Sequence, residues 1–290
     1  KKQSGITAAF DLDEDTGLSS SAMTYGGVTI AVKKGGVGIG IKGSALRAAN
    51  RDVIRDHIVE AGEVWADTLD IVALEAMFPT KSETLAAGGT LANSFVIGIK
   101  SWTSGGNTIV QDSTGKCTIV GADTVTYWYI PETITAGTIG GRLISSGSGS
   151  IVAKDLLLLK NDILGKNFEP DVVVMHPDRL ADILYDSSVK FLEKSVYKGE
   201  GELYNGELGK IWDTKVVVTT RMPRYGIAML DSKHLGYEVT RKPLKLTRDE
   251  YTGMSLDVLY FWGFAEVNYG VVNPEAYGAV AFQGSLTEAN

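Results

Sequence analysis

Cysteine is almost absent from this chain, which has only Cys117 among its 290 residues. A single thiol excludes an internal disulfide and a metal site built from cysteines. Proline is scarce as well, with 7 residues, whereas glycine is abundant, with 34. Abundant glycine, together with many threonines and valines, favours strands and turns over a helical bundle.

Long apolar runs and an excess of basic residues are also missing. No stretch of 18 or more apolar residues occurs, so we expect no membrane-spanning segment, and no signal peptide is recognisable. The formal net charge is −7. Proteins that bind nucleic acid through their surface are usually basic, so that activity is not expected here, and solubility explains the charge. With 44% apolar residues, the chain is long enough for one large domain or two smaller ones.

No pattern typical of catalysis or of metal binding occurs. His57, His176 and His234 are far apart and lack metal-ligand spacing, so caps or surface positions are expected for them. There is neither a G-x-S-x-G elbow nor a P-loop. Cys117 has only Lys116 as a basic neighbour, which is typical of a buried and unreactive thiol. The sequence therefore predicts no enzyme, no cofactor and no metal site.

The N-terminal 43 residues are predicted to form an arm and a hairpin. Residues 1–23 are polar and contain an acidic cluster, which indicates an extended arm that a neighbouring subunit would order. Residues 24–43 alternate in hydrophobicity on both sides of a Lys33–Gly36 turn, which predicts a β-hairpin. A lone hairpin is marginal in water and needs a partner surface. The hairpin residues that we expect to make assembly contacts are Val28, Ile30, Val32, Lys33, Lys34, Val37, Ile39 and Ile41.

One string within this region, Gly38–Gly43, matches the G-x-G-x-x-G pattern of dinucleotide-binding loops. That pattern requires a preceding strand and a helix that opens on it. The apolar alternation here continues through the glycines, so we interpret the string as part of a strand.

Residues 50–78 are predicted to form a long helix. Asn50 can cap it, Asp52 lies in its first turn, and Pro79 ends it. An apolar stripe at helical spacing runs along one side: Ile54, Ile58, Ala61, Trp65, Leu69, Val72 and Ala76. A second stripe is acidic and comprises Asp52, Asp56, Glu60, Glu63, Asp67 and Asp70. This stripe is either a solvated face, or it faces an enclosed genome and prevents adhesion because carboxylates and phosphates repel each other.

Residues 84–150 are rich in Gly, Ser and Thr, and their closely spaced strands predict a small inserted all-β module. Its aromatic residues are interpreted as core in preference to a ligand-binding patch: Trp102, Tyr127, Trp128 and Tyr129. Gly147–Ser150 is predicted to be a flexible linker. A helix over 152–165, a buried strand at Asp171–Met175 and a helix from Pro177 to about Tyr185 follow, which indicates mixed α/β structure.

The last third carries the most informative pattern. It reads GELGKIWDTKVVVTTRMP from Gly206, GIAMLDSKHLGYEVTRKPLKL from Gly226 and LYFWGFAEVNYGVVNPEAYGAVAF from Leu259. This order of strands resembles the C-terminal half of tailed-virus major capsid proteins of the Hong Kong 97 (HK97-like) fold. Encapsulin nanocompartments share that fold.

The resemblance implies an α+β fold with five parts. They are an N-terminal arm (1–23), an extended-loop hairpin (24–43), a peripheral domain (44–83 and 224–290) with spine helix 50–78, an inserted β module (84–150) and an axial domain (151–223). It also implies that the chain assembles with copies of itself into pentamers and hexamers of an icosahedral shell.

In that family the shell encloses double-stranded DNA without sequence-specific binding. Scaffold, maturation protease and portal proteins are implied as partners, with assembly in the host cytoplasm and a final place in the virion. Because the chain starts at Lys1, trimming by such a protease is one interpretation, and a tag scar or a missing leader is another. The alternatives are an encapsulin-type shell around a cargo enzyme and a β-rich carbohydrate-binding or adhesin module built on residues 84–150.

Overall fold

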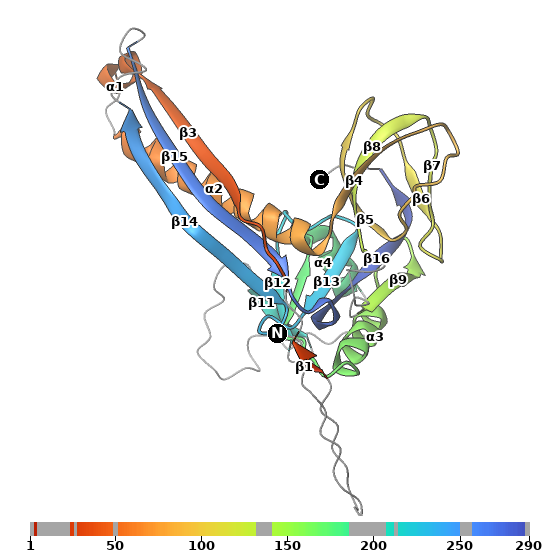
Figure 1. Cartoon of the computed structure of the whole chain (residues 1–290). Coiled ribbons are helices and arrows are strands. Elements are labelled where there is room, and N and C mark those ends of the chain that lie inside the picture. The colour runs from red at the N-terminus through yellow and green to blue at the C-terminus, as the bar shows by residue number, and fades with distance from the viewer. Residues whose placement is uncertain are drawn as a thin grey trace, which may run out of the picture.

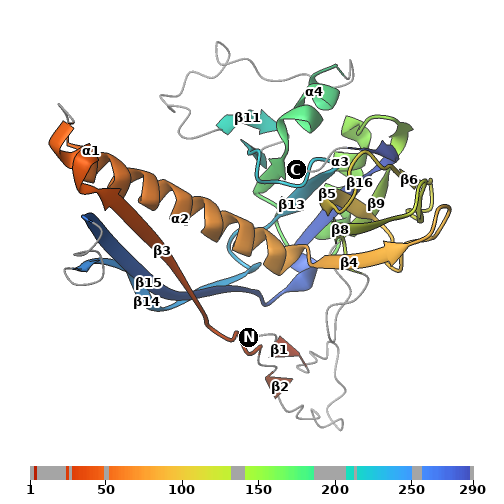
Figure 2. The same ribbon diagram turned by 90° about the horizontal axis from the view of Figure 1, so that it is seen from above.

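The computed structural model describes residues 3–4, 24–25, 28–48, 52–131, 141–185, 207–211, 214–249 and 257–287. They form an α+β structure in which a long, narrow arm extends from a broader body (Figure 1). The view from above shows that the arm has two layers, a helix and a sheet (Figure 2).

The arm is built from one long helix and three strands. Strand β15 (Val258–Val271) lies between β14 (Gly236–Asp249) and β3 (Lys33–Lys42), and all pairs are antiparallel. Helix α2 (Val53–Met77) lies along one face of this sheet, and the short helix α1 (Gly43–Ala48) lies at the tip (Figure 1). The buried cluster between the helix and this sheet is small and contains Ile39, Ile41 and Ala61.

The hairpin predicted over 24–43 is wrong. Lys33–Gly36 is not a turn, because Lys33–Lys42 forms one continuous strand that pairs with β15 along its whole length. Gly36, Gly38 and Gly40 allow this close pairing, since rings of β15 occupy the space where their side chains would be. Residues Thr24–Tyr25 instead form strand β2, which pairs with β1 (Gln3–Ser4). The rest of the predicted arm over 1–23 lies outside the described residues.

The predicted helix is confirmed with shorter bounds. Helix α2 begins at Val53, and Asp52 is its N-cap, because its side chain accepts a hydrogen bond from the Arg55 N–H. Asn50, the predicted cap, lies outside the described residues. The helix ends at Met77, before Pro79 as predicted. Its apolar stripe faces the sheet, where Ile54 and Ile58 pack around Ala61.

The body is organised around an eight-stranded sheet with the order β11-β12-β10-β13-β16-β6-β7, in which β9 also pairs with β16. A second sheet has the order β4-β8-β5. The first sheet consists of β6 (Ile109–Gln111), β7 (Cys117–Ile119), β9 (Gly141–Ser148), β10 (Val172–Met175), β11 (Glu207–Ile211), β12 (Thr214–Val218), β13 (Gly226–Leu230) and β16 (Tyr277–Leu286). The other body elements are β4 (Thr80–Leu85), β5 (Val96–Trp102), β8 (Asp123–Tyr129), α3 (Ala153–Leu164), α4 (Pro177–Tyr185) and the 3₁₀ turn Pro274–Ala276. The predicted strand and helices between 152 and 185 are thus confirmed.

Residues 84–150 are not confirmed as a separate module. Strands β6 and β9 both pair with β16, although β16 starts more than 130 residues after each of them. Ile109 and Cys117 share one buried core with Leu156 and Val280 of the body. The aromatic residues of this region are core residues, as predicted: Tyr127 is fully buried and Trp128 is 7% exposed.

The linker predicted at Gly147–Ser150 is wrong as well. Its polar residues suggested flexibility, but Gly147 and Ser148 belong to β9, Ser148 pairs with Gln283 of β16, and the Gly149 N–H donates to the Gln283 carbonyl. The buried Asp155 carboxylate holds this turn in place, since it accepts hydrogen bonds from the Ser145 hydroxyl and from the hydroxyl and N–H of Ser146. Such a satisfied polar network specifies one local structure where composition alone indicates none.

The last strand also differs from the prediction. Residues 224–290 were assigned to the peripheral domain, but only β14 and β15 lie in the sheet of the arm, whereas β13 and β16 lie in the sheet of the body. Strand β16 lies in the body between β13 and β6, because the 3₁₀ turn at Pro274–Ala276 redirects the chain. The arm and the body therefore share one continuous C-terminal segment.

Candidate assembly surfaces

The face of the arm's sheet that points away from α2 carries an aromatic row. Tyr260, Trp262 and Phe264 alternate along β15 with inward residues such as Gly263 and Ala265. The Tyr260 and Trp262 rings are stacked, with centroids 5.8 Å apart and an interplanar angle of 17°. Trp262 is 42% exposed and Phe264 is 46% exposed. In a soluble protein, adjoining exposed rings of this size mark an interaction surface.

The glycines of β3 make this row possible. Gly36, Gly38 and Gly40 are paired with Phe264, Trp262 and Tyr260 across the sheet. A Cβ atom at Gly38 would lie 2.6 Å from the Trp262 ring, and one at Gly40 would lie 2.8 Å from the Tyr260 ring. The rings therefore lie flat over bare backbone and form an even surface, which a side chain on β3 would disrupt.

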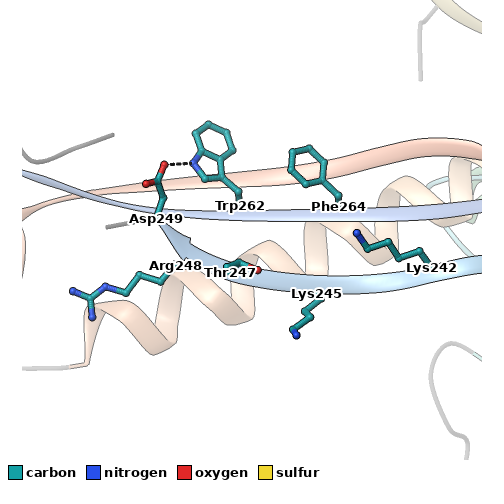
Figure 3. Close-up of a pocket in the computed structure, with 7 residues that line it drawn as sticks. All are labelled: Lys242, Lys245, Thr247, Arg248, Asp249, Trp262 and Phe264. Carbon is teal, nitrogen blue, oxygen red and sulfur yellow. Dashed lines mark hydrogen bonds between the residues drawn. The ribbon is translucent and has the colours of Figure 1, made fainter. Parts of the chain in front are cut away.

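Basic residues border these rings. Together with Trp262 and Phe264, residues of β14 line a groove of about 460 Å³: Lys242, Lys245, Thr247, Arg248 and Asp249. Figure 3 shows the two rings side by side on β15 and the Asp249 carboxylate turned toward the indole nitrogen. The Trp262 Nε1–H donates to Asp249 over 3.3 Å, and the Lys34 ammonium lies 4.5 Å from the centre of the Phe264 ring. The groove is thus aromatic at its centre and cationic at its border.

The opposite side of the arm is acidic. Asp56, Glu60 and Glu63 are exposed on the outer face of α2, as the predicted stripe requires. Two members of the stripe have local structural roles, because Asp52 caps the helix and Asp67 forms an ion pair with Arg221. Asp70, the last member, is exposed near Tyr269, and burial and the nearby carboxylates of Glu238 and Asp70 raise the pKa of that phenol.

Part of the predicted assembly set is not available to a neighbour. Ile39 and Ile41 are 8% and 2% exposed, because they face α2 of the same chain, and Val37 packs beside them. Ile30 lies against Gly270, whose missing side chain leaves it room. Val28, at 55% exposed, and the two lysines at the start of β3 remain accessible, and Val32 is half-buried. The even spacing of these apolar residues identified a buried face, but it could not say which chain buries it.

The cysteine and the three histidines, which were expected to be chemically inert, are buried or form local hydrogen bonds. Cys117 is 1% exposed, and burial raises the pKa of its thiol to about 12. The His57 Nδ1–H donates to the Val53 carbonyl, the Asp178 N–H donates to His176 at the start of α4, and the His234 ring contacts Asp231. Among the described residues, no three His, Cys, Asp or Glu side chains gather into a possible metal site. In the same part of the chain, no helix is long and apolar enough to span a membrane.

Sequence reasoning missed the aromatic and basic groove. The signal was present in the alternation Tyr260-Phe261-Trp262-Gly263-Phe264 and in the lysines of β14, but nothing in the sequence aligns these segments with the glycines of β3.

Comparison with known proteins identifies the fold through solved structures and not through sequence. No protein-family model matches the chain, and no curated protein matches its sequence. Among solved structures, the capsid of a native GTA particle is similar with a TM-score of 0.58 and 14% identity, over 96% of this chain and 82% of the other.

Two further structures agree with this result. The capsid of the cyanophage P-SCSP1u is similar with a TM-score of 0.58 and 14% identity, over 97% of this chain and 81% of that one. The holo-SrpI encapsulin complex from Synechococcus elongatus is similar with a TM-score of 0.54 and 10% identity, over 90% and 77%. The long helix on a narrow sheet, the sheet of the body and this near-complete correspondence show that the chain has the Hong Kong 97 fold of capsid and encapsulin shells.

Proposed function

We propose that this chain is the major capsid protein of a tailed virus, which assembles with copies of itself into pentamers and hexamers of an icosahedral shell. The observation that carries the proposal is the likeness to capsid subunits over 96% of the chain, arm and body together. Double-stranded DNA, held without sequence-specific contacts, is the proposed content. Scaffold, maturation protease and portal proteins are the proposed assembly partners in the host cytoplasm, and no enzymatic activity is proposed.

The physical character of the arm supports self-assembly. The buried cluster between its two layers is small, with Ile39, Ile41 and Ala61, and its outer sheet face leaves aromatic rings exposed. Such a surface gains stability when another subunit covers it, since burial of apolar area contributes about 25 cal/mol per Å². Contacts of this kind, repeated by rotational symmetry, close into rings and shells.

An encapsulin-type shell is the second candidate, because an encapsulin chain matches 90% of this chain with the same fold. The two candidates differ in their contents, nucleic acid against a protein cargo. A carbohydrate-binding or adhesin module is not supported, since Tyr127 and Trp128, on which it depended, lie in the core.

We expect the purified full-length chain to form closed particles tens of nanometres across, or rings of five or six subunits. Negative-stain electron microscopy with light scattering on the same sample measures this directly. Extraction of the particles then identifies nucleic acid or protein inside. A stable 31.1 kDa monomer at all salt and protein concentrations, also with a co-expressed scaffold, would contradict the proposal.

The acidic stripe of α2 gives a second prediction, that it faces the enclosed genome and limits adhesion to it. We expect the combined change Glu60→Gln and Glu63→Gln to increase the nucleic acid that purified shells retain, because it removes two exposed charges and no described ion pair. Absorbance of washed particles at 260 and 280 nm is the measurement. The control is Asp162→Asn, which removes an exposed carboxylate on α3 together with its ion pair to Lys166. If the wild type and both variants retained equal amounts of nucleic acid, the prediction would be wrong and the stripe would be a solvated face only.

A further inference from the structure

We propose that the aromatic and basic groove of β14 and β15 binds the acidic segment 10–15 of a second copy of this chain. The inference rests on the proposed shell function, since only assembly brings another copy beside the arm. Segment 10–15 reads Phe-Asp-Leu-Asp-Glu-Asp and lies outside the described residues, so only its sequence bears on the contact.

The groove is a built surface with a definite chemical preference. Its floor consists of the Trp262 and Phe264 rings, which Gly38 and Gly36 of β3 allow to lie flat against the sheet. Rings that are nearly half exposed favour an apolar side chain that covers them. A ligand that covered only the rings would leave the basic side chains at the border without partners, so we expect the ligand to carry charge as well.

The basic side chains at the border of the groove favour a negatively charged ligand. Lys242 and Lys245 project from β14 and form no ion pair with any described residue, and the Lys34 ammonium lies over the Phe264 ring. The carboxylate in the groove, Asp249, accepts the Trp262 indole N–H. Carboxylates placed near the lysines would satisfy charges that now face solvent, and complementary charge of this kind fixes which surfaces meet.

Segment 10–15 has the matching composition. Four of the five residues from Asp11 to Asp15 are acidic, which is the densest run of carboxylates in the chain. Phe10 and Leu12 supply apolar side chains at alternate positions between acidic ones. Every subunit carries one such segment and one such groove, so the two are present in equal numbers in any assembly.

A single-stranded nucleic acid would also suit aromatic rings with a basic border. The observations favour the peptide. Asp249 within the groove and the chain's net charge of −7 both repel a phosphate backbone, whereas a peptide of mixed apolar and acidic residues can place its carboxylates away from Asp249.

The test brings the two surfaces together by cysteine pairing between full-length chains. One chain carries Thr16→Cys, next to the acidic run, and a separately expressed chain carries Thr247→Cys, in the groove. The native Cys117 does not interfere because it is 1% exposed. After mixing and mild oxidation with diamide, we expect a disulfide between residues 16 and 247, identified by mass spectrometry. The control partner is Val120→Cys, an exposed position on the body.

Reversing the charges on the groove and then on segment 10–15 tests whether electrostatic attraction causes the contact. We expect Lys242→Glu with Lys245→Glu to lower the yield of that disulfide about tenfold, which corresponds to about 1.4 kcal/mol. Adding Asp11→Lys and Asp13→Lys on the other chain should restore most of it, because the interaction energy of a contacting pair is not additive. The same yields should fall at high salt, where charges are screened.

The outcomes separate this contact from the shell itself. Closed particles by microscopy without a 16–247 disulfide above the Val120→Cys control would overturn the groove contact and leave the shell. A 16–247 disulfide without particles would support the contact and overturn the shell. An oligonucleotide that the wild-type groove binds while the 16–247 pairing fails would also overturn the proposal.

Discussion

Replacing Phe78 with alanine is expected to lower the free energy of unfolding by about 3–5 kcal/mol and to prevent particle formation. Phe78 follows the last residue of α2 and is fully buried, and its ring meets the Tyr277 ring edge to face at 5.9 Å. The Tyr277 hydroxyl in turn donates to the Met77 carbonyl over 2.9 Å. This contact joins the end of the arm's helix to β16 of the body, so its loss affects stability and the direction of the arm together.

Chemical denaturation and negative-stain microscopy of the same samples measure both effects. The matched control is Val59→Ala, which shortens a 53% exposed side chain on the same helix and should change the free energy of unfolding by less than about 0.5 kcal/mol. If Phe78→Ala were as stable as Val59→Ala, the contact between Phe78 and Tyr277 would not join arm and body as described. Normal particles from a clearly destabilised Phe78→Ala protein would mean that assembly does not depend on this junction.

Replacing Ile41 with aspartate is expected to unfold the arm while the body stays folded. Ile41 is 2% exposed and belongs to a small buried cluster with Ile39 and Ala61, beneath α2. An unpaired carboxylate there costs about 3–5 kcal/mol, which exceeds what so small a core can compensate. The body has its own, much larger buried cluster, so its stability should be largely independent of this change.

Hydrogen exchange read by mass spectrometry resolves the two parts. We expect amide protection to be lost in β3, α2 and β15 and to be kept in β10, β13 and β16. The control is Lys42→Asp, one residue further along the same strand, where the side chain is exposed on the other face. Equal loss of protection in both variants would show that β3 does not present alternate faces, and loss throughout the molecule would show that arm and body unfold as one unit.

Much of the fold could be predicted because its signals are local. The apolar stripe of α2 repeats every three or four residues, and Pro79 marks its end. Val172–Met175 and the helix that starts at Pro177 follow from a run of apolar β-branched residues and from a proline that suits a first helical turn. These features depend on the neighbours of each residue in the chain, so the sequence is enough to identify them.

Most of the errors concern partners that are distant in the sequence. The alternation at Val37, Ile39 and Ile41 is real, but its glycine-rich start looked like a hairpin turn, although it is the start of a strand that pairs with β15 more than 200 residues later. In the same way, β6 and β9 looked like parts of an inserted module until their pairing with β16 placed them in the main sheet. Strand propensity says that a segment pairs, whereas burial and register over the whole chain decide with which segment.

By itself, then, the sequence determined the type and rough extent of most elements, the buried state of Cys117 and Tyr127, and an order of strands typical of Hong Kong 97 shells. Only the tertiary structure decided which face of β3 is buried and brought Trp262 and Phe264 over its glycines beside the lysines of β14. The physical reason is that such a surface arises from three segments whose alignment depends on long-range hydrogen bonding and on packing against α2, which no local pattern encodes.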